Sequence, residues 1–186
     1  MNPSTVAHDL SNNQPSRREL LIGALAALPA GAASNEMRPV RRLVTGDDHA
    51  GHSALLFTTA GANTIELNGA KITRLWESDG VPAELPIGSD RGGTAANAYR
   101  DGFRGTSLYV ADIPPGNRNA IPMHREDSLD YIAVLAGEID LVLETASVTM
   151  RAGDVLVQGG NLHTWVNRSD NTCRLLVVVL RATRKN

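Results

Sequence analysis

An all-β domain, built as a sandwich or a barrel, is the fold class that the sequence predicts. From Val40 onward the apolar residues come in short runs separated by Gly, Asn, Asp and Pro, as expected for short strands joined by turns. The chain of 186 residues contains 17 glycines and 9 prolines, which favours turns over helix bundles. No segment after residue 37 has the length and periodicity of a helix.

Composition restricts the possible partners. The length leaves room for one compact domain with an appendage, and a hydrophobic content of 42% is enough to build a core. A formal net charge of -2 gives no reason to expect a nucleic-acid partner. The single cysteine, Cys173, excludes an intramolecular disulfide and adjoins an apolar run, so we expect a buried, unreactive thiol.

Residues 1–36 have the features of a twin-arginine export signal. Arg17 and Arg18 precede a short apolar stretch and a small-residue tail, with cleavage expected after Ala32 or Ala33. The mature protein, with its folded domain over residues 37–186, would then be periplasmic or exported and free of the membrane. Two alternatives remain open: an amphipathic N-terminal helix, or translation from Met37, which would leave the product cytoplasmic.

The strands of the mature domain follow from the positions of the apolar runs and turn signals. The expected strands are Val40–Val44, Ser53–Phe57, Thr64–Leu67, Ala70–Trp76, Ser107–Ile113, Tyr131–Ala136, Ile139–Glu144, Ser147–Met150, Val155–Gln158, Thr164–Asn167 and Cys173–Leu180. The segment 77–105 lacks a period and is rich in Gly, Ala, Asp and Pro. It is interpreted equally well as a surface excursion or as a lid over a binding site.

Two segments carry the residues suited to chemistry. The first contains His124, Glu126, Asp130 and Gly137, with three and six residues in the last two gaps. The second begins at Gly153-Asp154 and continues through an apolar strand and a Gly-Gly turn. It ends on His163 and, after three more residues, Asn167.

This pair of segments resembles the two motifs of the cupin superfamily, over about residues 107–180. The resemblance implies a single-domain cupin β-barrel, which is a double-stranded β-helix or jelly roll, and a homodimer. It also implies an interior site for a small-molecule substrate. Cupin metal sites usually use three His and one Glu, whereas here Glu126 replaces the second His and Asp130 replaces the Glu.

Strand geometry supports a shared site independently of the resemblance. Residues two apart in a strand face the same side, which places His124 with Glu126, and His163 with Trp165 and Asn167. Two inward carboxylates need a cation, a protonated histidine or water beside them. We therefore expect His124, Glu126, Asp130 and His163 to bind a divalent transition metal, with Fe, Mn, Ni, Co and Zn all compatible.

Each of these residues also has a plainer interpretation. Glu126 could turn outward beside Arg125, and Asp130 is one methylene shorter than the Glu it replaces. Trp165 and Met123 are candidate substrate contacts, although Trp165 fits a core position equally well. Asn167 is better explained as a residue that hydrogen-bonds a turn, and Tyr131, one residue out of register, should face outward.

The function expected from these features is that of a small-molecule enzyme in which Glu126 and Asp130 are catalytic. The candidate reactions are oxygenation, isomerisation, decarboxylation or dehydration of a carbonyl-bearing or aromatic substrate. Two alternatives stay open: a non-catalytic ligand-binding or sensing cupin, and a metal-free enzyme in which a His and a carboxylate transfer protons.

Overall fold

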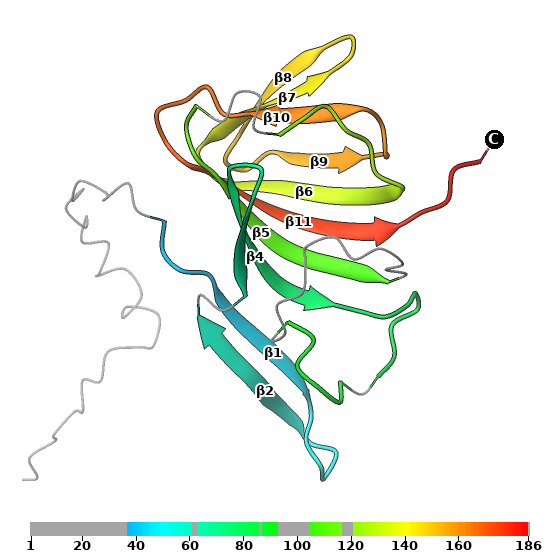
Figure 1. Cartoon of the computed structure of the whole chain (residues 1–186). Helices are drawn as coiled ribbons and strands as arrows, with labels where there is room; N and C mark the ends of the chain where they lie inside the picture. Colours follow the sequence, from blue (N-terminus) through cyan, green and yellow to red (C-terminus); the bar gives the residue numbers. More distant parts are fainter. Residues whose placement is uncertain (1–36, 61–62, 86, 93–104, 117–120, 186) are drawn as a thin grey trace, which may run out of the picture. The chain divides into compact units, whose positions relative to one another are not determined.

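Strands supply the regular structure of this chain in the computed structural model, which describes residues 37–60, 63–85, 87–92, 105–116 and 121–185. Their bounds are β1 Arg41–Asp47, β2 Ser53–Ala60, β3 Thr64–Leu67, β4 Ala70–Glu77, β5 Thr106–Ile113, β6 Ser128–Ala136, β7 Glu138–Leu143, β8 Ser147–Arg151, β9 Val155–Gln158, β10 His163–Val166 and β11 Cys173–Arg181 (Figure 1). These residues belong to one compact unit, residues 35–186. The predicted export signal and, within the segment 77–105, residues 86 and 93–104 lie outside the described residues.

The all-β prediction is confirmed, and each expected strand is present, most of them with small shifts at their ends. The ends of β1 and β2 and the start of β6 shift by three residues, and β6 begins at Ser128 and not at Tyr131. Its first inward residues, Ser128 and Asp130, are buried but polar, so the apolar alternation that identifies a strand does not include them. No helix in the described part of the chain has the length and apolar character needed to cross a membrane.

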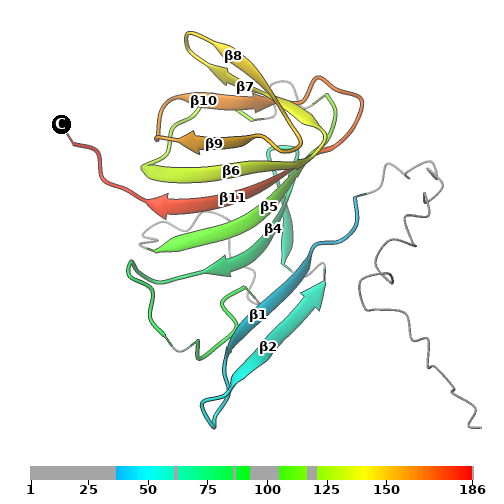
Figure 2. The same ribbon diagram turned by 180° about the vertical axis from the view of Figure 1, so that it is seen from behind.

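Two antiparallel sheets enclose the interior. The larger has the order β3-β4-β5-β11-β6-β9 and the smaller the order β10-β7-β8. Figures 1 and 2 show β4, β5, β11, β6 and β9 side by side, with the smaller sheet beyond β9. Strand β11 lies between β5 and β6 in the sheet although it is far from both in sequence. This is the crossed connectivity of a jelly-roll barrel.

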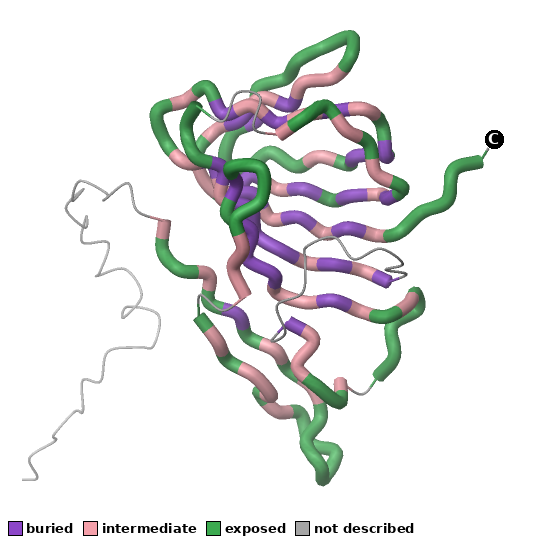
Figure 3. Tube along the Cα trace, viewed as in Figure 1, coloured by how far each residue is buried: buried purple, intermediate pink, exposed green. Residues whose placement is uncertain are grey.

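The core lies between the sheets and is made by alternate residues of each strand. Along β11, Cys173, Leu175, Val177 and Val179 are buried while the residues between them are less so, a pattern visible in Figure 3. Ile139, Leu141, Met150 and Trp165 complete the core from the smaller sheet. Cys173 is fully buried as predicted, and burial raises the pKa of its thiol to about 12, which keeps it uncharged and unreactive.

The turn between β6 and β7 depends on a glycine. Gly137 has a φ of 75°, and a Cβ atom there would lie 2.7 Å from the carbonyl oxygen of Thr172. Only glycine combines the left-handed conformation with this close approach. This requirement explains the glycine that ends the first motif.

The hairpin of β1 and β2 forms a separate two-stranded sheet. Arg42 connects it to later segments, because its guanidinium pairs with both carboxylate oxygens of Asp90 at 2.5 Å and donates to the carbonyl of Leu75. A two-stranded hairpin is marginally stable by itself, so contacts of this kind are needed to hold it.

The outer face of β6 and β9 is apolar and exposed. Tyr131, Leu135, Val155 and Val157 are all exposed there, and Tyr131 pairs with Val157 across the two strands. The outward direction predicted for Tyr131 is therefore confirmed. The homodimer implied by the resemblance stays a prediction.

Asn167 closes the loop between β10 and β11 and has no exposed surface. Its amide donates to the carbonyls of Ile113 and Asn171 at 2.8 and 2.7 Å. Its side-chain oxygen accepts from the backbone N–H of Ser169 at 3.0 Å and from the Ser169 hydroxyl at 2.7 Å. The turn-holding role predicted for this residue is confirmed, and it explains the final Asn of the second motif.

Replacing Asn167 by alanine should lower the free energy of unfolding by about 2–4 kcal/mol, because several buried partners lose their hydrogen bonds together. Urea unfolding followed by circular dichroism measures this change. Asn171→Ala is the matched control, since only its backbone groups are bonded to the loop. Equal stability of the two variants would contradict the assigned role.

Candidate functional site

Two imidazoles are brought together by a pair of backbone hydrogen bonds. The N–H of His124 donates to the carbonyl of His163 at 2.9 Å, and the N–H of His163 donates back to that of His124 at 2.8 Å. Residues that exchange both bonds lie directly opposite each other and point their side chains to the same face. The ring centroids are consequently 4.4 Å apart, with an angle of 48° between the planes.

Close packing of the loops holds the segment of His124 against β10. Gly160 has a φ of 62°, and a Cβ atom there would lie 2.6 Å from the carbonyl oxygen of Glu126. The Thr164 hydroxyl donates to the carbonyl of Ile121 at 2.6 Å. The glycine-containing turn before His163 therefore allows the two site-bearing segments to approach.

Both rings have a defined protonation pattern. Nδ1 of His124 lies 2.9 Å from the carbonyl oxygen of Pro122, and Nδ1 of His163 lies 2.9 Å from that of Asn161. A carbonyl oxygen can only accept, so each Nδ1 carries the proton, and in the neutral ring Nε2 keeps a free lone pair. Nε2 is then able to bind a metal, accept a proton or accept a substrate hydrogen bond.

Burial keeps His163 neutral. It is buried among the described residues, and this burial lowers the pKa of the ring below its ordinary value of 6.5. The hydrogen bond to Asn161 raises the pKa and positive charge on His124 lowers it, both by less than burial does. The ring of His163 is thus a base with an open nitrogen at neutral pH.

Asp130 is the buried carboxyl group of the site. It lies on β6, and its Oδ1 atom is buried without a hydrogen-bond partner. Burial raises its pKa above the ordinary 3.8, and the charge of Glu126 raises it further. The nearby Ser128 hydroxyl and the charge of His124 lower the pKa, although Ser128 makes no hydrogen bond of normal geometry to it. This carboxyl group therefore retains its proton to a higher pH than an exposed one.

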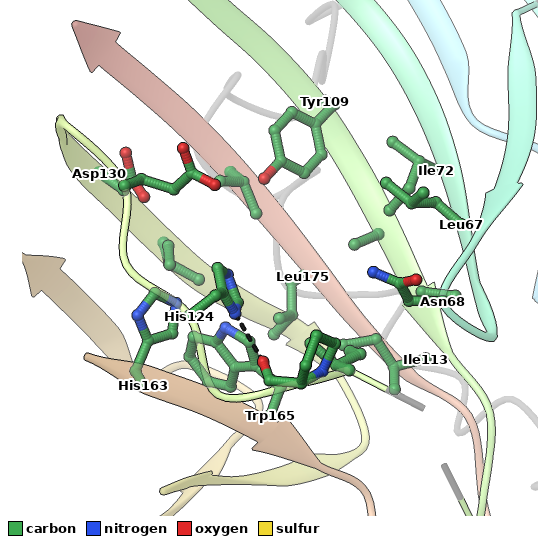
Figure 4. Close-up of a pocket in the computed structure, with 17 residues that line it drawn as sticks. Leu67, Asn68, Ile72, Tyr109, Ile113, His124, Asp130, His163, Trp165 and Leu175 are labelled. Atoms are coloured by element: carbon green, nitrogen blue, oxygen red, sulfur yellow. Dashed lines mark hydrogen bonds between the residues drawn. The ribbon is translucent and has the colours of Figure 1, made fainter. Parts of the chain in front are cut away.

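One cavity of about 350 Å³ is lined by His124, Glu126, Asp130 and His163 together. Figure 4 shows His124, His163 and Asp130 on one side, with Leu67 and Ile72 on the other. Glu126 also lines the cavity, so it is turned inward and not toward Arg125. The rest of the wall is mainly apolar, which suits a small molecule with an apolar body and one polar end.

The two predicted substrate contacts lie in different places. Trp165 lines the cavity with its ring 6.2 Å from that of His163 at 81°, and it also belongs to the buried core. Met123 is 42% exposed and absent from the cavity wall, because its neighbour His124 takes the inward position. Its position gives no support to a substrate contact.

Several wall residues have no motif signal in the sequence. Tyr109 of β5, Ile72 of β4 and Asn68 of the β3–β4 turn contribute to the cavity. Strand alternation places Tyr109 and Ile72 inward, but which inward residues meet the two histidines depends on the order of strands in the sheet. Only the fold supplies that order.

The fit of a metal is incomplete. The described residues contain no group of three or more His, Cys, Asp and Glu side chains placed to hold a metal ion. His124 and His163 fit in kind and in orientation, since each offers Nε2 with Nδ1 bound to a carbonyl. The carboxylates of Glu126 and Asp130 line the same wall without completing such a group. The four-residue metal centre stays a prediction.

Comparison with known proteins places these features in a family. Residues 109–179 match the model of the Cupin domain. The Phomopsin biosynthesis cluster protein C' of Diaporthe leptostromiformis is 45% identical over 80 residues, which are 42% of this chain and 41% of that protein. The chain thus matches about two fifths of the length of that relative.

A second relative matches over most of both chains. The cupin-domain-containing oxidoreductase fogC of Aspergillus ruber is 31% identical over 151 residues, covering 76% of this chain and 72% of the relative. Among solved structures, the cupin domain of Schizosaccharomyces pombe Cnp3 has a TM-score of 0.47 at 13% identity, covering 78% of this chain and 89% of that one. With the domain match and a relative aligned over most of its length, the chain belongs to the cupin family, as its two motifs predict.

Proposed function

We propose that the chain is a cupin-type enzyme that moves protons on a small, mainly apolar molecule bearing a carbonyl group. The observation that carries the proposal is the gathering of His124, His163, Glu126 and Asp130 at one side of an otherwise apolar cavity. An apolar wall excludes water and strengthens the interactions of the polar groups that remain.

The roles follow from the hydrogen bonds and burial of each group. Nε2 of His163 accepts a proton from the carbon next to the carbonyl, since its lone pair is open and its ring neutral. Asp130 in its protonated form donates its proton to the carbonyl oxygen. The product of this step is an enol, with His163 protonated and Asp130 ionised. Where a second double bond is conjugated with the enol, His163 returns its proton to the far carbon of that system and Asp130 takes back the hydroxyl proton, which regenerates the carbonyl and completes an isomerisation.

Glu126 and His124 influence the two groups that exchange protons, Asp130 and His163. Glu126 raises the pKa of Asp130 through its negative charge, so the donor keeps its proton to a higher pH than it would without Glu126. His124 shares the backbone pair with His163 and presents a second open Nε2, which can accept a hydrogen bond from the hydroxyl group of the enol. In this proposal Glu126 and His124 position and tune the groups that exchange protons.

A metal-dependent oxidoreductase is the second candidate. Two observations favour it: the pair of imidazoles with Nδ1 bound to carbonyls, and the similarity to fogC, which is named as an oxidoreductase. Imidazole and carboxyl groups do not accept electrons, so oxidation requires a bound metal or another acceptor. His124 and His163 would hold the metal, which would supply Lewis-acid or redox chemistry when bound.

Proton exchange tests the first candidate with cyclohexanone as the probe. In D2O the wild-type protein should accelerate loss of the α-proton signals in the NMR spectrum, and His163→Gln should slow this reaction by about 10²-fold or more. Asp130→Asn should slow it as well, because the amide has no acidic proton to donate. Tyr131→Phe, on the outer face, is the control. Exchange at the buffer rate with wild-type protein, or no effect of His163→Gln, would contradict proton transfer at this site.

Elemental analysis separates the second candidate from the first. Protein purified without chelators should contain Fe, Mn, Ni, Co or Zn in stoichiometric amount if the imidazoles hold a metal. That content should fall to background in both His124→Ala and His163→Ala and persist in Tyr131→Phe. Proton exchange that survives chelation in metal-free protein would favour the first candidate.

The free energy of unfolding should depend on pH because His163 is buried. Because its pKa is lowered in the folded state, the unfolded chain binds more protons as the pH falls below 6.5. The free energy of unfolding should therefore decrease from pH 7.5 to pH 5.5, by about 1.4 kcal/mol for each pKa unit of difference that this interval spans. Urea unfolding at both pH values measures the decrease, which should be smaller in His163→Gln. The exposed residue His49, changed to Gln, is the control; identical pH dependence in both variants would refute this assignment.

A further inference from the structure

A polar side chain, Asn68, lines the cavity on the wall away from the histidines. It shares this wall with the apolar residues Leu67 and Ile72. Figure 4 shows all three across the cavity from Asp130 and His163, the two groups that exchange protons in the proposed reaction. The Asn68 amide has no part in that reaction, so its place in an apolar wall needs a separate explanation.

The hairpin of β3 and β4 fixes the position of this amide. Leu67 pairs with Ala70, so Asn68 and Gly69 form a two-residue loop, with φ values of 50° and 75°. Positive φ at both positions defines a type I′ turn, for which Asn-Gly is a preferred sequence. Ala70, directly after the turn, is buried in the core. The turn is therefore short and anchored, and it holds the amide at the cavity wall.

The Asn68 amide is accessible to a ligand. Asn68 and its neighbour Leu67 are both exposed to solvent while they line the cavity, so this wall belongs to the opening. The side chain of Asn68 forms no hydrogen bond with the residues that the structure describes. An amide offers two N–H donors and one oxygen acceptor. A ligand that reaches the opening can therefore form a direct hydrogen bond in place of one to water.

The charges around the cavity restrict which group binds to Asn68. Glu126 and Asp130 line the same cavity, and none of the described residues in its wall is Lys or Arg. An anionic group would be repelled by Glu126 with no positive charge to balance it. A cationic group would be attracted to the carboxylates at the other end and not to the uncharged amide. A neutral hydroxyl or carbonyl group is the partner that fits Asn68.

We infer that Asn68 is a specificity residue, which binds a second neutral polar group at the end of the ligand opposite its carbonyl group. The ligand is then a bifunctional molecule, with a carbonyl near His163, a hydroxyl or second carbonyl near Asn68, and an apolar body along Leu67 and Ile72. The inference rests on the proposed function for the identity of the first group. Binding at Asn68 itself requires no proton transfer.

Matched pairs of ketones test the inference, because a hydroxyl group can bond to either half of the amide. One pair is 4-(hydroxymethyl)cyclohexanone and 4-ethylcyclohexanone, which have the same shape and differ by the hydroxyl group. The 4-(2-hydroxyethyl) and 4-propyl ketones form a longer pair. In at least one pair, Asn68→Gly should shift the ratio of the two dissociation constants by about three- to ten-fold against the hydroxyl ketone, because one hydrogen bond is lost. Isothermal titration calorimetry measures these constants.

Asn63→Gly is the matched control. Asn63 also has a positive φ, 58°, and it lies outside the cavity wall, so this change should leave both ratios as in the wild-type protein. Glycine adopts positive φ freely, and Gly-Gly also forms type I′ turns, so both variants should fold, which circular dichroism verifies. Unchanged ratios in Asn68→Gly, an equal shift in Asn63→Gly, or no binding of any of the four ketones would overturn the inference.

Proton exchange on the same ketones separates this inference from the proposed function. A ratio that depends on Asn68, without faster loss of the α-proton signals in D2O, would refute the proposed reaction and support the binding residue. Faster exchange, with ratios that do not depend on Asn68, would support the reaction and overturn the inference. The two proposals therefore fail on different measurements.

Discussion

The reciprocal hydrogen bonds between the backbones of His124 and His163 are the constraint from which the site follows. They join a segment before β6 to the start of β10, and so place two imidazoles on the same inner face. Each ring is then fixed by a carbonyl only two residues before it, at Pro122 and at Asn161. Ring position and tautomer are therefore properties of the local backbone, and they do not require a bound ligand to establish them.

The interior of the barrel also contains buried polar groups. A barrel of this size buries alternate residues of every strand, and most are apolar. At one end of the large sheet the inward residues are polar, from Ser128 and Asp130 on β6 to Gln158 on β9. Such groups reduce stability unless bonded, so their presence is better explained by binding than by folding.

The sequence predicted the barrel and its motifs from local signals, and it missed features that depend on strand order. Alternation and turn residues identify β3 and β9 to the residue, and the spacing of His124 and His163 is sufficient to place them together. The early start of β6 was missed because Ser128 and Asp130 are polar and buried. The inward direction of Gln158 beside Asp130 was missed for a related reason, because only the register of β6 and β9 pairs the two residues.

Asp130 has the cavity on one side and Gln158 on the other, and this double position constrains how it can act. One face of its environment is the cavity with Glu126 and His124, whose charges shift its pKa in opposite directions. The other is Gln158, paired with it across β6 and β9, whose free oxygen can only accept. Only the protonated form of this carboxyl group can donate toward that acceptor, and only the protonated form can donate to a carbonyl oxygen in the cavity. A single carboxyl group thus faces acceptors on both sides, and its proton determines what it can do at either.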